Sequence, residues 1–152
     1  MKNKIITLCS SASMYEKLIQ MERDLVRLGF KALVPVSARK MEQAGDFSLK
    51  GEKAWMKDPS QFFQKTALMD AHFKKVEEGD AILVVNLDKG GIKGYIGGNV
   101  LMEMMLAYWL KKPIYIWKNI DREHPFYEEI LGINPIFLNE DLSNYPSFVP
   151  TR

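Results

Sequence analysis

The sequence has few residues of the types that build disulfides, zinc sites or membrane spans. Its 152 residues include one cysteine, Cys9, and two histidines. One cysteine excludes an internal disulfide, and so few cysteines and histidines argue against a structural zinc site. No apolar run approaches the roughly 18 residues that a membrane-spanning helix requires. We therefore expect no membrane partner.

An excess of charge of one sign is also missing. The chain carries 21 basic and 19 acidic residues, a formal net charge of +2, and the basic residues are scattered. Binding of a nucleic acid polymer requires a clustered basic face, so we do not expect such a partner. Residues 1–10 combine two lysines with a short apolar run that lacks the pattern of a signal peptide. We therefore expect a cytoplasmic protein.

The pattern of apolar residues predicts an α/β protein. Apolar residues make up 47% of the chain, and its length suggests one domain over residues 1–152. Strand-like and helix-like patterns alternate, which predicts a doubly wound, Rossmann-like parallel sheet of five strands in the flavodoxin-like order 2-1-3-4-5. The expected strands are 4–9, 31–36, 80–87, 114–117 and 135–138, and the expected helices are 14–28, 59–78, 99–110 and 125–131.

Two segments lack a regular pattern. Residues 37–58 contain Gly45, Gly51 and mixed charges, which predicts an irregular insert with no more than a helical turn. Such an insert is either a lid over a substrate or a surface excursion. The tail, residues 139–152, contains two prolines and is also expected to be irregular.

The most informative stretch is residues 94–103, which joins an apolar strand to an apolar helix. It is rich in glycine, and Glu103 is the only charged residue between Lys93 and Lys111. Burying a lone carboxylate costs free energy unless it has partners or a function. The predicted strand order places the topological switch between the first and third strands, so we expect a polar pocket there, with Glu103 beside it.

Several polar residues and glycines around this pocket are candidates for substrate binding. Their glycine spacing matches neither the dinucleotide fingerprint nor the phosphate-binding loop. The same residue types also occur in ordinary turns and at strand ends, and that alternative stays open. The candidates are Ser10, Ser11, Asn86, Asp88, Gly94, Tyr95, Gly97, Gly98 and Asn99.

Glu103 and His72 are the candidates for catalysis. The positive end of the helix dipole favours the ionised form of Glu103, which suits a nucleophile or a hydrogen-bond acceptor. Alternatively, the carboxylate only neutralises the helix end or pairs with a lysine. His72 is either an acid or base at neutral pH or an exposed residue without a function. Cys9 is expected to be a small core residue.

Part of the chain resembles a known family. The run from Asp80 to Asn86, the Gly94-Tyr-Ile-Gly-Gly98 loop, Glu103, Ala107 and Lys112-Pro113-Ile114 resemble the nucleoside 2-deoxyribosyltransferase-like superfamily over residues 68–117. That superfamily includes the deoxynucleoside-monophosphate N-glycosidases. The resemblance implies that Glu103 acts on the anomeric carbon of the sugar. In the family, an aspartate at the position of His72 helps to protonate or orient the base. This chain therefore departs from the family pattern at that residue.

Two functions follow from these residues. The first is cleavage of an N-glycosidic bond, or deoxyribosyl transfer, on a nucleoside or nucleotide, with Glu103 as nucleophile or oxocarbenium stabiliser and His72 as proton donor. This chemistry requires no metal or redox cofactor. The second is a non-catalytic nucleotide-binding or sensing module on the same fold, which the histidine at position 72 favours. A structural domain with a vestigial pocket is a third alternative.

The expected helix 99–110 is apolar on nearly all sides. A helix of this kind is buried all round, and a sheet covers only one of its faces. We therefore expect a homodimer or a larger homo-oligomer through residues 99–110. The alternative is that a loop or the tail of the same chain covers this helix.

Overall fold

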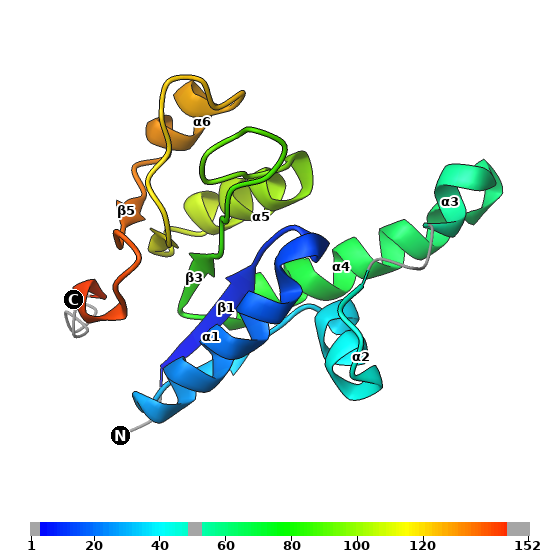
Figure 1. Cartoon of the computed structure of the whole chain (residues 1–152), viewed down its shortest axis with the longest axis horizontal. Coiled ribbons are helices and arrows are strands. Elements are labelled where there is room, and N and C mark those ends of the chain that lie inside the picture. Colours follow the sequence, from blue (N-terminus) through cyan, green and yellow to red (C-terminus); the bar gives the residue numbers. More distant parts are fainter. Residues whose placement is uncertain (1–3, 49–52, 146–152) are drawn as a thin grey trace.

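Five short strands form one parallel sheet at the centre of the molecule (Figure 1). The computed structural model describes residues 4–48 and 53–145. The strand order is β2-β1-β3-β4-β5, which confirms the predicted order 2-1-3-4-5 and the α/β fold class. The strands are β1 (Ile5–Cys9), β2 (Lys31–Leu33), β3 (Ala81–Val84), β4 (Ile114–Ile116) and β5 (Ile136–Phe137).

Helices cover both faces of the sheet, because each central strand is apolar on both sides. Alternating residues of β1 face opposite layers, so Leu8 packs in one apolar cluster and Cys9 in the other. Helices α1 (Tyr15–Arg27) and α2 (Val36–Ala44) contribute buried residues to the first cluster. The second cluster contains buried residues of α4 (Phe62–Glu78), α5 (Gly98–Trp109) and α6 (Tyr127–Gly132). All four residues of β3 are buried, as expected for a central parallel strand.

Helix α4 is the longest helix among the described residues and runs from the sheet toward one end of the molecule (Figure 1). Its N-terminal end, with η2 (Pro59–Gln61) and α3 (Ala54–Lys57), extends away from the sheet in Figure 1. At its other end, Lys112 donates to the carbonyl oxygens of Val76, Glu77 and Gly79. A lysine at this place satisfies carbonyl groups that the helix leaves open. Lys112, a residue of the family-like segment, is therefore part of the scaffold.

The insert 37–58 is more regular than the sequence predicts. Residues Val36–Ala44 form the nine-residue helix α2, so the expectation of an irregular insert is wrong for this part. The helix is stabilised by tertiary contacts that no local pattern encodes: Ala38 is fully buried, and Arg39 donates to Glu22 of α1 at 2.6 Å. Gly45 ends the helix with a φ of 67°, which favours glycine. Residues 49–52 of the insert lie outside the described residues.

The predicted irregular tail begins as expected after β5. Residues Leu142–Asn144 form a single 3-10 turn, η3, and Tyr145 packs in the core beside Tyr115. The rest of the predicted tail, residues 146–152, lies outside the described residues. In the part of the chain that the structure describes, no helix is both long and apolar enough to cross a membrane.

Candidate functional site

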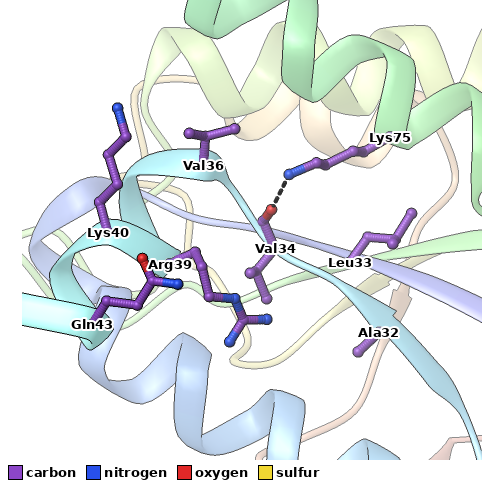
Figure 2. Close-up of a pocket in the computed structure, with 8 residues that line it drawn as sticks. All are labelled: Ala32, Leu33, Val34, Val36, Arg39, Lys40, Gln43 and Lys75. Carbon is purple, nitrogen blue, oxygen red and sulfur yellow. Dashed lines mark hydrogen bonds between the residues drawn. The ribbon is translucent and has the colours of Figure 1, made fainter.

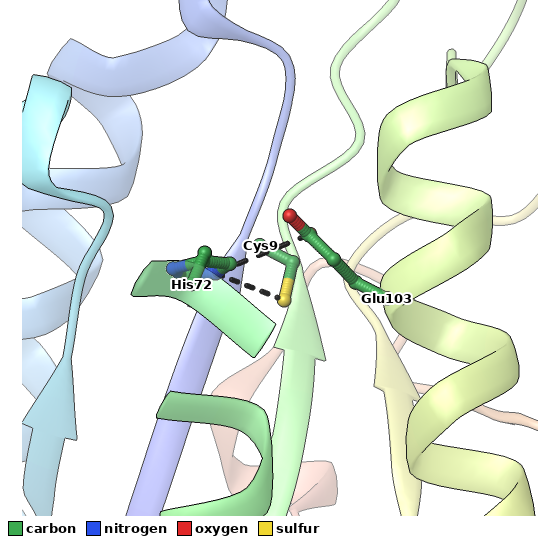
Figure 3. A group of neighbouring side chains, drawn as sticks. All are labelled: Cys9, His72 and Glu103. Atoms are coloured by element: carbon green, nitrogen blue, oxygen red, sulfur yellow. Dashed lines mark hydrogen bonds and ion pairs between the residues drawn. The ribbon is translucent and has the colours of Figure 1, made fainter. Parts of the chain in front are cut away.

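Three buried side chains from distant parts of the chain meet near the carboxyl end of β1. They are Cys9, the last residue of β1, His72 of α4 and Glu103 of α5. Figure 3 shows these side chains pointing toward one another. The Nε2 atom of His72 lies 3.5 Å from the Sγ atom of Cys9 and 4.0 Å from the Oε2 atom of Glu103. The structure thus brings both predicted catalytic residues together.

The carboxylate of Glu103 has one partnered and one unpartnered oxygen. Its Oε1 atom accepts a hydrogen bond from Nδ2 of Asn99 at 3.1 Å, and Oδ1 of Asn99 accepts from Nζ of Lys65 at 3.1 Å. Its Oε2 atom is buried without a hydrogen-bond partner among the described residues. A buried oxygen without a partner costs free energy, so this oxygen makes Glu103 a candidate for a functional role.

Burial controls the protonation of Glu103. The residue is only 3% exposed, and desolvation raises the pKa of Glu103 to about 7, an effect that the Cys9 thiol and the charge of Lys65 only partly offset. Burial therefore opposes the expected preference for the ionised form, and near neutral pH the carboxyl group is present in both forms. The helix dipole acts mainly within the first turn, and Glu103 lies in the second turn of α5, so desolvation outweighs it.

His72 is buried and neutral, neither exposed nor a ready proton donor. Burial, and then the positive charge of Lys75, lower the pKa of His72 to about 4. Burial also raises the pKa of the Cys9 thiol well above its ordinary value. At neutral pH the imidazole is therefore a neutral ring, which donates a hydrogen bond from one nitrogen and accepts one at the other. This protonation state does not support the expected role of His72 as a proton donor.

Asn86 and Asp88 form hydrogen bonds with the loops after β3 and β4. The amide of buried Asn86 donates to the carbonyl oxygens of Gly94 at 3.1 Å and Lys118 at 2.9 Å, and its Oδ1 atom accepts from the Lys118 amide at 2.8 Å. Asp88 is exposed and accepts from the Gly94 amide at 2.9 Å and from Nζ of Lys118 at 3.0 Å. Both residues therefore stabilise the loop after β3, and their role in substrate binding stays a prediction.

Close packing explains two of the glycines in this region, Gly94 and Gly97. Gly94 has a φ of 59°, and a Cβ atom there would lie 2.7 Å from Nδ2 of Asn86. A Cβ atom at Gly97 would lie 3.1 Å from the hydroxyl of Tyr95, while Gly98, the first residue of α5, faces open space. Of the predicted substrate-binding residues in this loop, Asn99 is the one that contacts Glu103.

The two serines after β1 lie in a small turn. Ser10 donates to the carbonyl oxygen of Ser11 at 3.0 Å and is buried. The hydroxyl of Ser11 lies 3.1 Å from Nζ of Lys89, whose ammonium group also sits over the ring of Tyr95. Lys89 thus contacts both Ser11 and Tyr95 of the glycine-rich loop.

Cys9 is a small core residue, as predicted, since it is fully buried in the second apolar cluster. The sequence did not indicate that it lies beside His72, and it gave no role to His124. His124 is 3% exposed, and its Nε2 atom lies 3.1 Å from the backbone amide of Ile96, so it supports the loop before α5. No pattern around His124 predicts this contact, because the two residues lie on separate loops.

The cavity shown in Figure 2 lies elsewhere, at the edge strand β2. It has a volume of about 370 Å³ and contains none of the predicted site residues. Lys75 reaches across it to donate to the carbonyl oxygen of Val34 at 2.6 Å. The residues that line it are Ala32, Leu33, Val34, Val36, Arg39, Lys40, Gln43 and Lys75.

Comparisons with known proteins do not assign a family or a function to this chain. No family model and no curated protein matches the chain. Among solved structures, the chain is similar to a 2-deoxyribosyltransferase from the psychrotolerant bacterium Bacillus psychrosaccharolyticus, with 18% sequence identity, 77% of each chain covered and a TM-score of 0.48. A likeness at this level assigns neither activity nor substrate.

The site itself offers a defined chemistry. A carboxyl group with a pKa of about 7 is present in both protonation states at neutral pH, so it can attack, accept a proton or donate one. The neutral imidazole beside it can orient the unpartnered carboxylate oxygen or a leaving group. The site is closed, because Cys9, His72 and Glu103 are all at least 95% buried.

Proposed function

We propose that the protein cleaves the N-glycosidic bond of a nucleoside or nucleotide, by hydrolysis or by deoxyribosyl transfer. The single observation that supports this most is the Oε2 atom of Glu103, which is buried without a partner 4.0 Å from the imidazole of His72. The family-like sequence of residues 68–117 supports the same chemistry. The proposed substrates are cytoplasmic metabolites, so the proposal includes a cytoplasmic location.

In the proposed reaction, the bond between the anomeric carbon and the base nitrogen breaks and its electron pair leaves with the base. The sugar develops oxocarbenium character, and the ionised form of Glu103 stabilises that charge or forms an ester with the anomeric carbon. Water or a second base then attacks the anomeric carbon, which frees Glu103 as a carboxylate if the ester has formed, and the proton that this nucleophile loses passes to the departed base. His72 acts through a hydrogen bond, because its ring is neutral.

Substrate entry requires a local opening. Glu103 is 3% exposed, and a chain of hydrogen bonds runs from it through Asn99 of α5 to Lys65 of α4. The contact between Lys65 and Asn99 joins these two elements at the site. We propose that this contact opens when a nucleoside binds. Lid-like movements of this kind occur in many enzymes that exclude water.

The decisive experiment is an assay for free base. The wild-type protein and the Glu103→Gln variant are incubated with a panel of deoxynucleosides, ribonucleosides and their monophosphates, and released base is measured by chromatography. We expect release by the wild type and a loss of about 10²-fold or more in the variant. Glu16→Gln, which changes an exposed glutamate of α1, is the matched control. Absence of release by the wild type, or equal release by Glu103→Gln, contradicts the proposal.

The non-catalytic alternative is favoured by the closed site and by the neutral His72 in the place of the family aspartate. A sensing module would bind a nucleotide and release no base. Calorimetric titration with the same panel therefore separates the two functions, since binding without turnover identifies the module.

We also propose that the protein forms a homodimer or larger homo-oligomer through α5. Val100, Met104 and Ala107 of α5 are buried in the core, but its opposite face remains open. A contiguous apolar face of this size on one helix is typical of an interface. The exposed apolar residues are Met102, Met105, Tyr108, Trp109 and Leu110, with Trp109 76% exposed.

A further inference from the structure

We propose that Cys9, His72 and Glu103 together bind one divalent transition-metal ion of the Zn²⁺ class. One ligand atom from each residue lies within 4.8 Å of the other two. The three residues come from a strand and two helices, so their meeting is a product of the fold (Figure 3). This proposal does not rest on the glycosidic activity, although it involves the same carboxylate.

The spacing of the ligand atoms fits a tetrahedral ion. Zinc bonds to sulfur, nitrogen and oxygen are about 2.0–2.3 Å long, so neighbouring ligand atoms in a tetrahedron lie roughly 3.3–3.8 Å apart. The Nε2 atom of His72 lies 3.5 Å from Sγ of Cys9 and 4.0 Å from Oε2 of Glu103. Small side-chain movements therefore suffice to close the site around an ion.

The chemical types of the ligands also fit. Thiolate, imidazole and carboxylate are the common protein ligands of zinc. A thiolate and a carboxylate together carry two negative charges, which balance the charge of a divalent ion in a buried site. Binding then requires release of the Cys9 proton and of any proton on Glu103.

The orientation of Glu103 is the second, independent observation. Its Oε2 atom is buried, unpartnered and directed at the other two ligands, while Oε1 accepts from Asn99 at 3.1 Å. A hydrogen bond to the second carboxylate oxygen is the support that metal-ligating carboxylates require. Three protein ligands leave a fourth position for water or a substrate atom.

A bound ion would occupy the Glu103 oxygen that sugar cleavage requires. We therefore expect the metal-loaded protein to be inactive in base release and the chelated protein to be active. Because metal binding is measured without substrate, its failure leaves the glycosidic proposal intact. In the same way, absence of base release leaves the metal site intact.

The test uses Co²⁺ as a spectroscopic probe and then Zn²⁺. The full chain is dialysed against a chelator, returned to chelator-free buffer and titrated with Co²⁺. We expect one equivalent to bind, with a thiolate-to-cobalt charge-transfer band and the visible absorption of tetrahedral cobalt, and we expect Zn²⁺ to displace it. Zn²⁺ is also expected to raise the melting temperature of the wild type.

Variants decide which residues bind the ion. Cys9→Ala keeps a small buried side chain and is expected to lose the charge-transfer band, the Zn²⁺-dependent rise in melting temperature and at least tenfold in affinity. Asp70→Asn, which changes an exposed acidic residue of α4, is the control and should bind as the wild type does. No charge-transfer band in the wild type, or an unchanged band in Cys9→Ala, overturns the proposal. Circular dichroism of each metal-free variant confirms that it is folded.

Discussion

His72 and Glu103 lie 4.0 Å apart, and burial has reversed the order of their pKa values. A glutamate ordinarily loses its proton well before a histidine does. Here desolvation raises the pKa of Glu103 to about 7 and lowers that of His72 to about 4. Both shifts favour the neutral forms, since burial penalises charge of either sign. The two side chains are therefore not an ion pair at neutral pH.

This reversal predicts how pH affects stability through Glu103. Between its ordinary pKa of 4.5 and its folded pKa of about 7, the unfolded chain has lost a proton that the folded protein keeps. The carboxyl group's contribution to the free energy of unfolding therefore falls as pH rises through this window and stays constant above it. For each pH unit between these two pKa values, the free energy of unfolding falls by on the order of 1.4 kcal/mol.

Urea unfolding of the metal-free wild type and of Glu103→Gln from pH 4 to 8 measures this contribution. We expect the variant to gain stability relative to the wild type as pH rises from 4.5 to 7. Asp88→Asn is expected to show no such trend between pH 4 and 8. The Gly94 amide and then the Lys118 side chain lower the pKa of Asp88 from its ordinary value of 3.8, so the stabilising contribution of Asp88 is lost only as pH falls below that value. This variant should therefore be less stable than the wild type by a constant amount over this range. A pH-independent difference for Glu103→Gln would show that Glu103 is not buried as described.

Gly94 and Gly90 form a matched pair that separates backbone strain from crowding. Both have a positive φ, 59° and 58°, but a Cβ atom at Gly94 would lie 2.7 Å from Asn86, while Gly90 faces open space. We expect Gly90→Ala to cost about 1 kcal/mol and Gly94→Ala about 3 kcal/mol or more. Chemical denaturation of both variants measures the difference, and equal costs would contradict the crowded position of Gly94.

Asn86 is predicted to stabilise the loop after β3. Truncation to alanine removes its three hydrogen bonds with Gly94 and Lys118 and leaves buried backbone groups without partners. We expect Asn86→Ala to lower the free energy of unfolding by about 3 kcal/mol. Asn119→Ala changes an exposed asparagine of the neighbouring loop and should cost less than about 0.5 kcal/mol. Similar losses in both variants would argue against this role for Asn86.

The exposed apolar face of α5 predicts a homo-oligomer, and charged substitutions on that face should dissociate it. The double variant Met105→Lys and Trp109→Lys places two charges on the exposed apolar face, where both residues are more than half exposed. We expect light scattering to show a homo-oligomer for the wild type and a monomer for this variant. Val26→Lys changes an exposed valine of α1 and should leave the assembly intact. A monomeric wild type would refute the interface.

The sequence could predict the strand order and the segment that carries the site. Apolar runs that alternate with helical periodicity leave few arrangements for right-handed crossovers, and the structure has the predicted order. The isolation of Glu103 within an apolar helix also marked it as a candidate site residue, and in the structure it is buried beside His72. These features are local patterns of hydrophobicity, which can be recognised in the sequence alone.

Only the tertiary structure could decide which features depend on contacts between distant segments, among them the surroundings of Glu103. Helix α2 depends on contacts with α1, so its local composition pointed to a loop. Asn86 forms hydrogen bonds with Lys118, which lies more than thirty residues away, so its structural role could not be predicted from local sequence. The meeting of Cys9, His72 and Glu103 depends on the packing of α4 and α5 against the sheet. Desolvation depends on the whole surroundings of a group, so the protonation states of this site were decided by packing alone.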